Sequence, residues 1–159
     1  MKDFLAHSSR DGCPPQTYEA HIRGVYTKAS AYATDAEQYA AKAKDILTEI
    51  VQESALMHDL GKLDDENQKV LHSSDRRKCH LPINHVDAGS AALKSQDSQY
   101  AALMVYSHHR GLPDLETESL REEAFFRDEH AEMRKRTAET LDELLRRHEK
   151  SFRSQGVKQ

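Results

Sequence analysis

Apolar residues at helical spacing, with almost no competing strand pattern, restrict the fold of this chain more than any other feature. Between residues 36 and 60 the apolar side chains recur three or four positions apart, as on one face of a helix. These residues are Ile46, Leu47, Ile50, Val51 and Leu56. No run of useful length alternates apolar and polar residues, as a half-buried strand would. The sequence therefore predicts an all-α fold.

Capping residues and helix breakers give the expected limits of the helices. Thr17 can cap the first helix, and Gly61 is a natural C′ residue at the end of the second. Asn84 and Ser98 (or Asp97) precede two later helices, the second of which stops at Gly111 and Pro113. The expected helices cover about 17–33, 36–60, 64–71, 85–95, 98–110 and 120–150. The last is highly charged and carries only a thin apolar stripe.

Size and composition exclude several classes of protein. A chain of 159 residues corresponds to one domain, and no apolar run approaches the roughly 18 residues of a membrane span. The N-terminus lacks the apolar region of a secretory signal, and the distant Cys13 and Cys79 are expected to be reduced thiols. We therefore expect a cytoplasmic protein. A net charge of −4 argues against coating nucleic acid by bulk charge but leaves a local basic groove open.

Histidine is unusually frequent, at ten residues, and several histidines fall at the ends of expected helices. In chain order the candidates are His21, then His58 with Asp59, then His85, then His108 with His109. Helix ends can meet at one mouth of a bundle, where metal sites are built from facing helices. Imidazole and carboxylate ligands suit Mn, Fe, Co, Ni or Zn. Two such ions about 3.5–4 Å apart can activate water and clamp a phosphodiester.

Each of these groups, taken alone, can be explained without a metal. A single His-Asp dipeptide is typical of a surface ion pair, and Lys62 can simply interact with the helix end by its charge. The order of the four groups, each near a helix end, is what favours a metal site. The remaining histidines are expected to be solvated or locally hydrogen-bonded; they are His7, His72, His80, His130 and His148.

Four ordered motifs resemble the HD phosphohydrolase superfamily, and most closely the HD nuclease domain of the type I CRISPR-associated helicase-nuclease. They are FLAHSSRDGCPPQTYEAHIRGV, ALMHDLGK, LPINHVDAGSAAL and YSHHRGLPD. The resemblance covers about residues 4–115. It implies an HD-domain helical bundle in which 1–115 is a nuclease-like core and 116–159 is a charged helical extension of the same domain.

The resemblance also implies a ligand set and a reaction. His21, His58 and Asp59 would hold one metal, and Asp59 would bridge to a second. The second metal would be held by His85, His108 and His109. One or two divalent ions (Mn, Co, Ni or Fe) are implied, with Asp59 and Lys62 as catalytic residues. Arg110 beside the metals could bind a phosphate, although a solvated arginine is an equal reading.

The implied substrate is single-stranded DNA, cut by hydrolysis of a phosphodiester in CRISPR antiviral defence. The implied partners are a helicase, as a fused domain or a separate subunit, and the crRNA-guided surveillance complex; no membrane is implied. Two alternatives stay open: an HD phosphohydrolase acting on small nucleotides, and a truncated remnant that binds metal without turnover.

The chain departs from the family pattern in its C-terminal part. A further aspartate on a late helix completes the first metal site in the family, and neither Asp128 nor Asp142 has the apolar context of that residue. The chain is also shorter than family domains, so we expect it to be shortened at its C-terminus. Basic clusters at 134–136 and 146–147 could contact nucleic acid, but the interspersed acids favour a solvated helix face.

Overall fold

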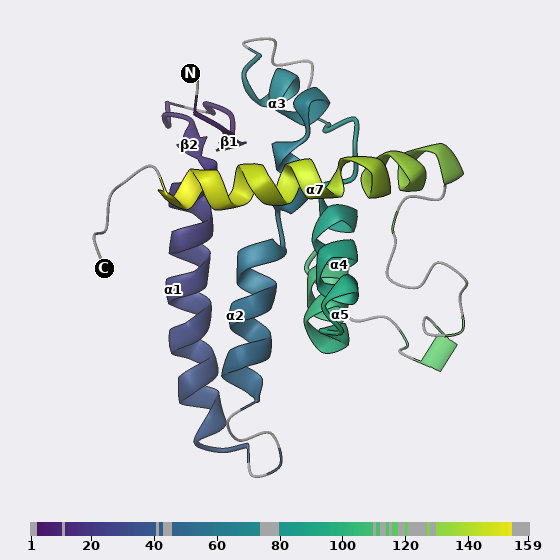
Figure 1. Ribbon diagram of the computed structural model, residues 1–159. Helices are drawn as coiled ribbons and strands as arrows, with labels where there is room; N and C mark the ends of the chain where they lie inside the picture. The colour runs from purple at the N-terminus through teal and green to yellow at the C-terminus, as the bar shows by residue number, and fades with distance from the viewer. Residues whose placement is uncertain are drawn as a thin grey trace.

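The computed structural model describes residues 3–10, 12–40, 42, 46–73, 80–109, 111, 114, 116–117, 120, 127 and 130–153. This part of the chain is mostly helical (Figure 1). Its α-helices are α1 (Tyr18–Glu37), α2 (Leu47–Met57), α3 (Asp65–Leu71), α4 (His85–Ser95), α5 (Gln99–Ser107) and α7 (Ala131–Arg153). A short 3₁₀ helix, η1 (Leu60–Leu63), and two strands, β1 (Leu5–His7) and β2 (Gln16–Thr17), complete the described elements.

The two strands make the all-α expectation too narrow at the N-terminus. β1 and β2 pair antiparallel, with Leu5 opposite Thr17 and His7 opposite Gln16. Strands of three and two residues are too short to show an alternating pattern in the sequence. A residue of α3 stabilises the strand pair, because the side chain of Gln68 hydrogen-bonds to both the N–H and the carbonyl of Leu5.

Two helix starts are confirmed by the expected capping side chains, whereas Ser98 precedes α5 without a capping hydrogen bond from its side chain. Thr17 Oγ1 accepts from Ala20 N at 3.3 Å, and Asn84 Oδ1 accepts from Val86 N at 3.1 Å. The expected start of the second helix at about 36 is wrong, because α1 continues to Glu37. The Glu37 carboxylate accepts from the N–H of Thr48 at 2.6 Å, in the first turn of α2.

Two glycines permit the close packing that sets the positions of the helix ends. A Cβ on Gly89 of α4 would lie 2.1 Å from the carbonyl oxygen of Met57, at the end of α2. A Cβ on Gly61 would lie 2.7 Å from the Cα of His85. Gly61 is therefore not the C′ residue that the sequence suggested. It lies inside η1 without a positive φ, and it is needed because another backbone touches it.

The C-terminal helix closes the core. α7 runs across the ends of α1 and α4 (Figure 1), with Leu144 buried against both. The shared cluster contains Tyr18, Ile22, Leu60, Leu63, Ala88, Ala92 and Leu144. A second cluster joins α4 to α5 and contains Val86, Leu93, Ala101, Ala102, Val105 and Tyr106. The long charged helix expected over 120–150 is thus found as α7 from Ala131 onward, and most of 121–129 lies outside the described residues.

None of the described helices has a sufficiently long apolar stretch to cross a membrane. The division of the chain at 115/116 stays a prediction.

Candidate metal centre

The structure brings all six of the expected metal ligands into two adjacent groups. The first group contains His21, His58 and Asp59, and the second contains His85, His108 and His109. Within each group the ligand atoms lie within 4.8 Å of one another. α1 supplies His21, and the turns after α2 and α5 supply His58, Asp59, His108 and His109. His85 is the first residue of α4.

Asp59 lies between the two groups and turns one carboxylate oxygen to each. Its Oδ2 lies 3.0 Å from His21 Nε2 and 3.3 Å from His58 Nε2. Its Oδ1 lies 3.5 Å from His85 Nε2 in the second group. The residue is only 1 % exposed, so the protein itself must provide the partners of this carboxylate. This is the arrangement of a carboxylate that bridges two cations.

Hydrogen bonds on the far side of two rings fix their tautomers. His58 Nδ1 donates to the carbonyl of Ala55 at 2.9 Å, and His21 Nδ1 donates to Gln16 Oε1 at 3.3 Å. Carbonyl oxygens only accept, so in each neutral ring Nε2 carries the lone pair. Such outer hydrogen bonds are typical of histidines that bind metals.

The first group therefore points several lone pairs at one place. His21 Nε2 and His58 Nε2 lie 3.2 Å apart, and two unprotonated nitrogens cannot bond to each other. Asp59 Oδ2 beside them is buried without a hydrogen-bond partner of suitable angle. Metal bonds to such atoms are about 2.0–2.2 Å long, which puts neighbouring ligands of one ion about 3 Å apart. The donor set and spacing of the first group fit a divalent transition metal.

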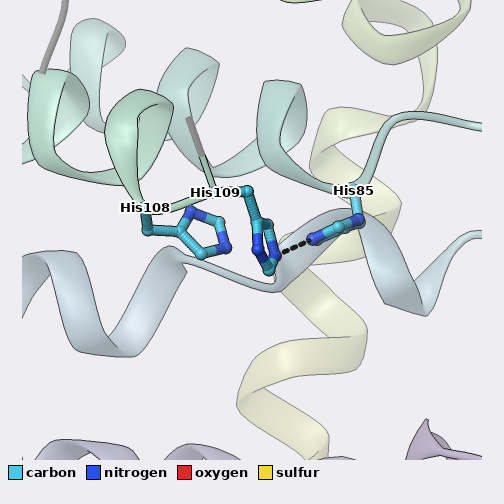
Figure 2. Close-up of side chains that lie close together, drawn as sticks. All are labelled: His85, His108 and His109. Carbon is cyan, nitrogen blue, oxygen red and sulfur yellow. Dashed lines mark hydrogen bonds between the residues drawn. The ribbon is translucent and has the colours of Figure 1, made fainter. Parts of the chain in front are cut away.

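The second group has the same character but is more open. Figure 2 shows its three imidazoles side by side, with His109 between His108 and His85. His109 Nε2 lies 3.1 Å from His85 Nε2, and His108 Nδ1 donates to the carbonyl of Val105 at 2.6 Å. His108 thus also presents Nε2 as a lone pair. His108 and His109 are exposed, whereas His85 is half-buried.

The pKa values favour the protonation states that metal binding requires. Partial burial of the rings lowers the pKa of His85 and of His108 to about 4, and it also lowers the pKa of His109. Burial alone would raise the pKa of Asp59, but hydrogen bonds from His21 and His58, which these rings make when Nε2 also carries a proton, and the charge of Lys62 hold it well below its usual range. At neutral pH the rings of the second group are neutral and the carboxylate is ionised, as ligands must be.

Lys62 forms an ion pair with the Asp59 carboxylate. It lies in η1, is 7 % exposed, and its Nζ is 2.8 Å from Asp59 Oδ2. Lys62 therefore neutralises Asp59 within the centre, whether or not it also reaches a phosphate. Of the other candidates, Arg110 and Asp128 lie outside the described residues. Asp142 is exposed on α7 and belongs to neither group.

Two histidines outside the expected ligand set are closer to this centre than the sequence indicated. The ring of His7 lies edge-on against His21, with centroids 4.7 Å apart, and burial lowers its pKa. His148 is buried rather than solvated, and its Nδ1 lies 3.0 Å from the hydroxyl of Tyr18. The position of His148, four residues after Leu144 on the apolar stripe, is a signal that could have identified it.

Comparisons of the chain with protein-family models, with curated proteins and with solved structures find no match.

Proposed function

We propose that this chain is a metal-dependent phosphodiesterase of the HD phosphohydrolase type, which cuts single-stranded DNA in CRISPR antiviral defence. The observation that carries the proposal is the position of Asp59 between two groups of histidines, with one oxygen toward each. A bridging carboxylate flanked by imidazoles is a ligand set for two transition-metal ions, and such pairs serve phosphodiester hydrolysis.

Each of the two groups of side chains would bind one ion. His21, His58 and Asp59 Oδ2 would hold one ion, while His85, His108, His109 and Asp59 Oδ1 would hold the other. Bound Mn, Co, Ni or Fe would supply Lewis-acid polarisation of the phosphodiester and a water of lowered pKa. Ala55, Gln16 and Val105 orient the rings through their carbonyl oxygens.

Lys62 is the residue that balances charge during the reaction. Its ammonium lies beside Asp59, in contact with the first group. A phosphate held by the ions would bring further negative charge there, and the ammonium would offset that charge. The exposure of His108 and His109 leaves the second group open to solvent, which suits a long strand better than an enclosed nucleotide. The identity of the substrate, and of a helicase and a crRNA-guided complex as partners, is taken from the motif resemblance.

The test is cleavage of circular single-stranded DNA with added Mn, Co or Ni, comparing the wild type with Asp59→Asn. The asparagine keeps the shape of the side chain but removes the charge that bridges the two groups. We expect cutting to fall by at least about 100-fold, in line with the loss of several kcal/mol of charge stabilisation. Asp142→Asn, on the exposed face of α7, is the matched control and should cut as the wild type does.

Full activity in Asp59→Asn would overturn the proposal. A wild type that turns over nucleoside mono- or triphosphates but leaves DNA intact would instead indicate a small-nucleotide phosphohydrolase. A folded wild type that holds metal but hydrolyses neither substrate would indicate a metal-binding protein without turnover.

A further inference from the structure

The antiparallel strand pair β1–β2 surrounds His21 on two sides. His7 and Gln16 are opposite each other in the register of the pair. Gln16 accepts a hydrogen bond from His21 Nδ1, and the ring of His7 packs edge-on against the ring of His21 at 4.7 Å. One cross-strand pair thus contacts one candidate metal ligand from both strands.

The strand that carries His7 is fixed to the rest of the centre by a buried side chain. Gln68, in α3, accepts from Leu5 N at 3.0 Å and donates to the Leu5 carbonyl at 2.8 Å. The same Nε2 of Gln68 donates to the carbonyl of Lys62 at 2.7 Å. β1 and η1 are therefore joined through Gln68, so His7 and Lys62 are held in a defined relation to each other. Ser8 adds a hydrogen bond from its Oγ to the Leu71 carbonyl at 2.8 Å.

His7 differs from the other histidines of the centre in what it can reach. It contacts His21 but belongs to neither group of converging ligand atoms, and its side chain is exposed while Asp59 behind it is buried. An imidazole carries at least one N–H in either protonation state, so it always offers a donor. A donor at the solvent side of a cationic centre is placed for the oxygens of a phosphate rather than for a metal.

We propose that His7 is a substrate-contacting residue, which donates a hydrogen bond to a phosphate oxygen of DNA bound at the first group. This inference rests on the proposed function, because it assigns to His7 a part of the same phosphodiester. It adds a residue of β1 to Lys62 and the two histidine groups, which the proposed function already assigns to the reaction.

The experiment measures steady-state cleavage of a short single-stranded oligonucleotide, together with the metal content of each variant. His7→Ala should raise KM about five- to tenfold, the size expected for one lost hydrogen bond, while kcat falls less than twofold. Metal content by mass spectrometry should equal that of the wild type. Either His7→Asn or His7→Gln, whose amides return an N–H near one of the ring nitrogens, should restore KM to within about twofold.

His80→Ala is the matched control, because His80 is an exposed histidine that belongs to neither group. It should leave KM, kcat and metal content unchanged. An unchanged KM in His7→Ala, with an active wild type, would overturn the inference while the proposed function stands. Loss of metal from His7→Ala would also overturn it, since His7 would then act by positioning His21. A wild type that does not cleave DNA would overturn both proposals.

Discussion

Asp59 and Lys62 show how much of the centre depends on single side chains. The carboxylate is buried, and four nitrogen-bearing groups approach it: the rings of His21, His58 and His85 and the ammonium of Lys62. A ring nitrogen donates to the carboxylate only when it carries a proton, whereas Lys62 always brings a positive charge. Burial alone would raise the pKa of Asp59, but hydrogen bonds from His21 and His58 and the charges of His58 and Lys62 hold it well below its usual range in the metal-free protein.

We predict that Lys62→Met destabilises the metal-free protein by about 3 kcal/mol, because it leaves a buried carboxylate without its charged partner. Urea unfolding in the presence of a chelator, at neutral pH, measures this change. Lys69→Met is the control, because Lys69 pairs with Glu66 on the exposed surface and should not change the midpoint measurably. Equal midpoints for Lys62→Met and the wild type would show that the histidines alone support the charge.

Sequence reasoning singled out the six side chains that the structure brings together, because their order and their places at helix ends are local properties. It missed His7 because a strand of three residues leaves no periodic pattern, and its position depends on Gln68, far along the chain. It misread Gly61 because a glycine that follows a helix usually serves as a cap. Only the approach of His85 shows the actual reason for that glycine.

At the scale of elements, the contact between α2 and α4 decides whether the two histidine groups meet. The Gly89 backbone lies against the carbonyl of Met57, one residue before His58. Four residues earlier on α4, His85 lies against Gly61. The distance between these two elements therefore sets the distance between Asp59 Oδ1 and the second group.

We predict that Gly89→Ala separates α4 from α2 and destabilises the fold by about 2–3 kcal/mol or more. The added Cβ would lie 2.1 Å from a backbone oxygen, which cannot move aside as the end of a flexible side chain could. Chemical denaturation measures the stability, and mass spectrometry of the purified protein should show that metal is lost from the centre.

The matched control is Gly24→Ala in α1, where a Cβ would meet nothing within 4 Å. This change should stabilise the protein by about 1 kcal/mol, because alanine is the better helix former. If Gly89→Ala had the same stability and metal content as the wild type, the packing of α2 on α4 would not be what holds the two groups together.

The helix α7 belongs to the element scale as well. Its basic residues are largely engaged within the chain: Arg136 binds Asp64 at 2.9 Å, and Arg147 binds Asp65 at 2.6 Å and the Leu63 carbonyl at 2.8 Å. These bonds end on η1 and the start of α3, beside Lys62. One arginine of each basic cluster, Arg136 and Arg147, thus attaches α7 to the elements that carry the centre, where the sequence had favoured a solvated helix face.

For the whole molecule, the mostly helical class and the helix starts after Thr17 and Asn84 could be read from the sequence, because caps and apolar spacing are short-range signals. The way in which α7 closes the bundle could not, since it depends on contacts between residues far apart in the chain. The clearest of these is the bond between His148 Nδ1 and the Tyr18 hydroxyl at 3.0 Å. It joins α7 to α1 one turn before His21.

This contact gives the molecule a dependence on pH that can be predicted in sign. Burial lowers the pKa of His148 in the folded protein, so the unfolded chain binds more protons as the pH falls below about 6.5. The contribution of neutral His148 is fully present above that pH and is lost as the pH falls toward the folded-state pKa. His85, His108 and His109 act in the same direction in the metal-free protein.

We therefore predict that the free energy of unfolding of the metal-free protein falls steeply between about pH 7 and pH 5, and less steeply in His148→Gln. Glutamine keeps a donor for Tyr18 but cannot take up a proton, so the slope should decrease by up to about 1 kcal/mol per pH unit. Urea titrations in chelator at several pH values measure both slopes. His80→Gln removes an exposed histidine instead and should keep the wild-type slope. If His148→Gln kept the wild-type slope too, protonation of His148 would not lower the free energy of unfolding. The contact of α7 with α1 would then tolerate a charged ring.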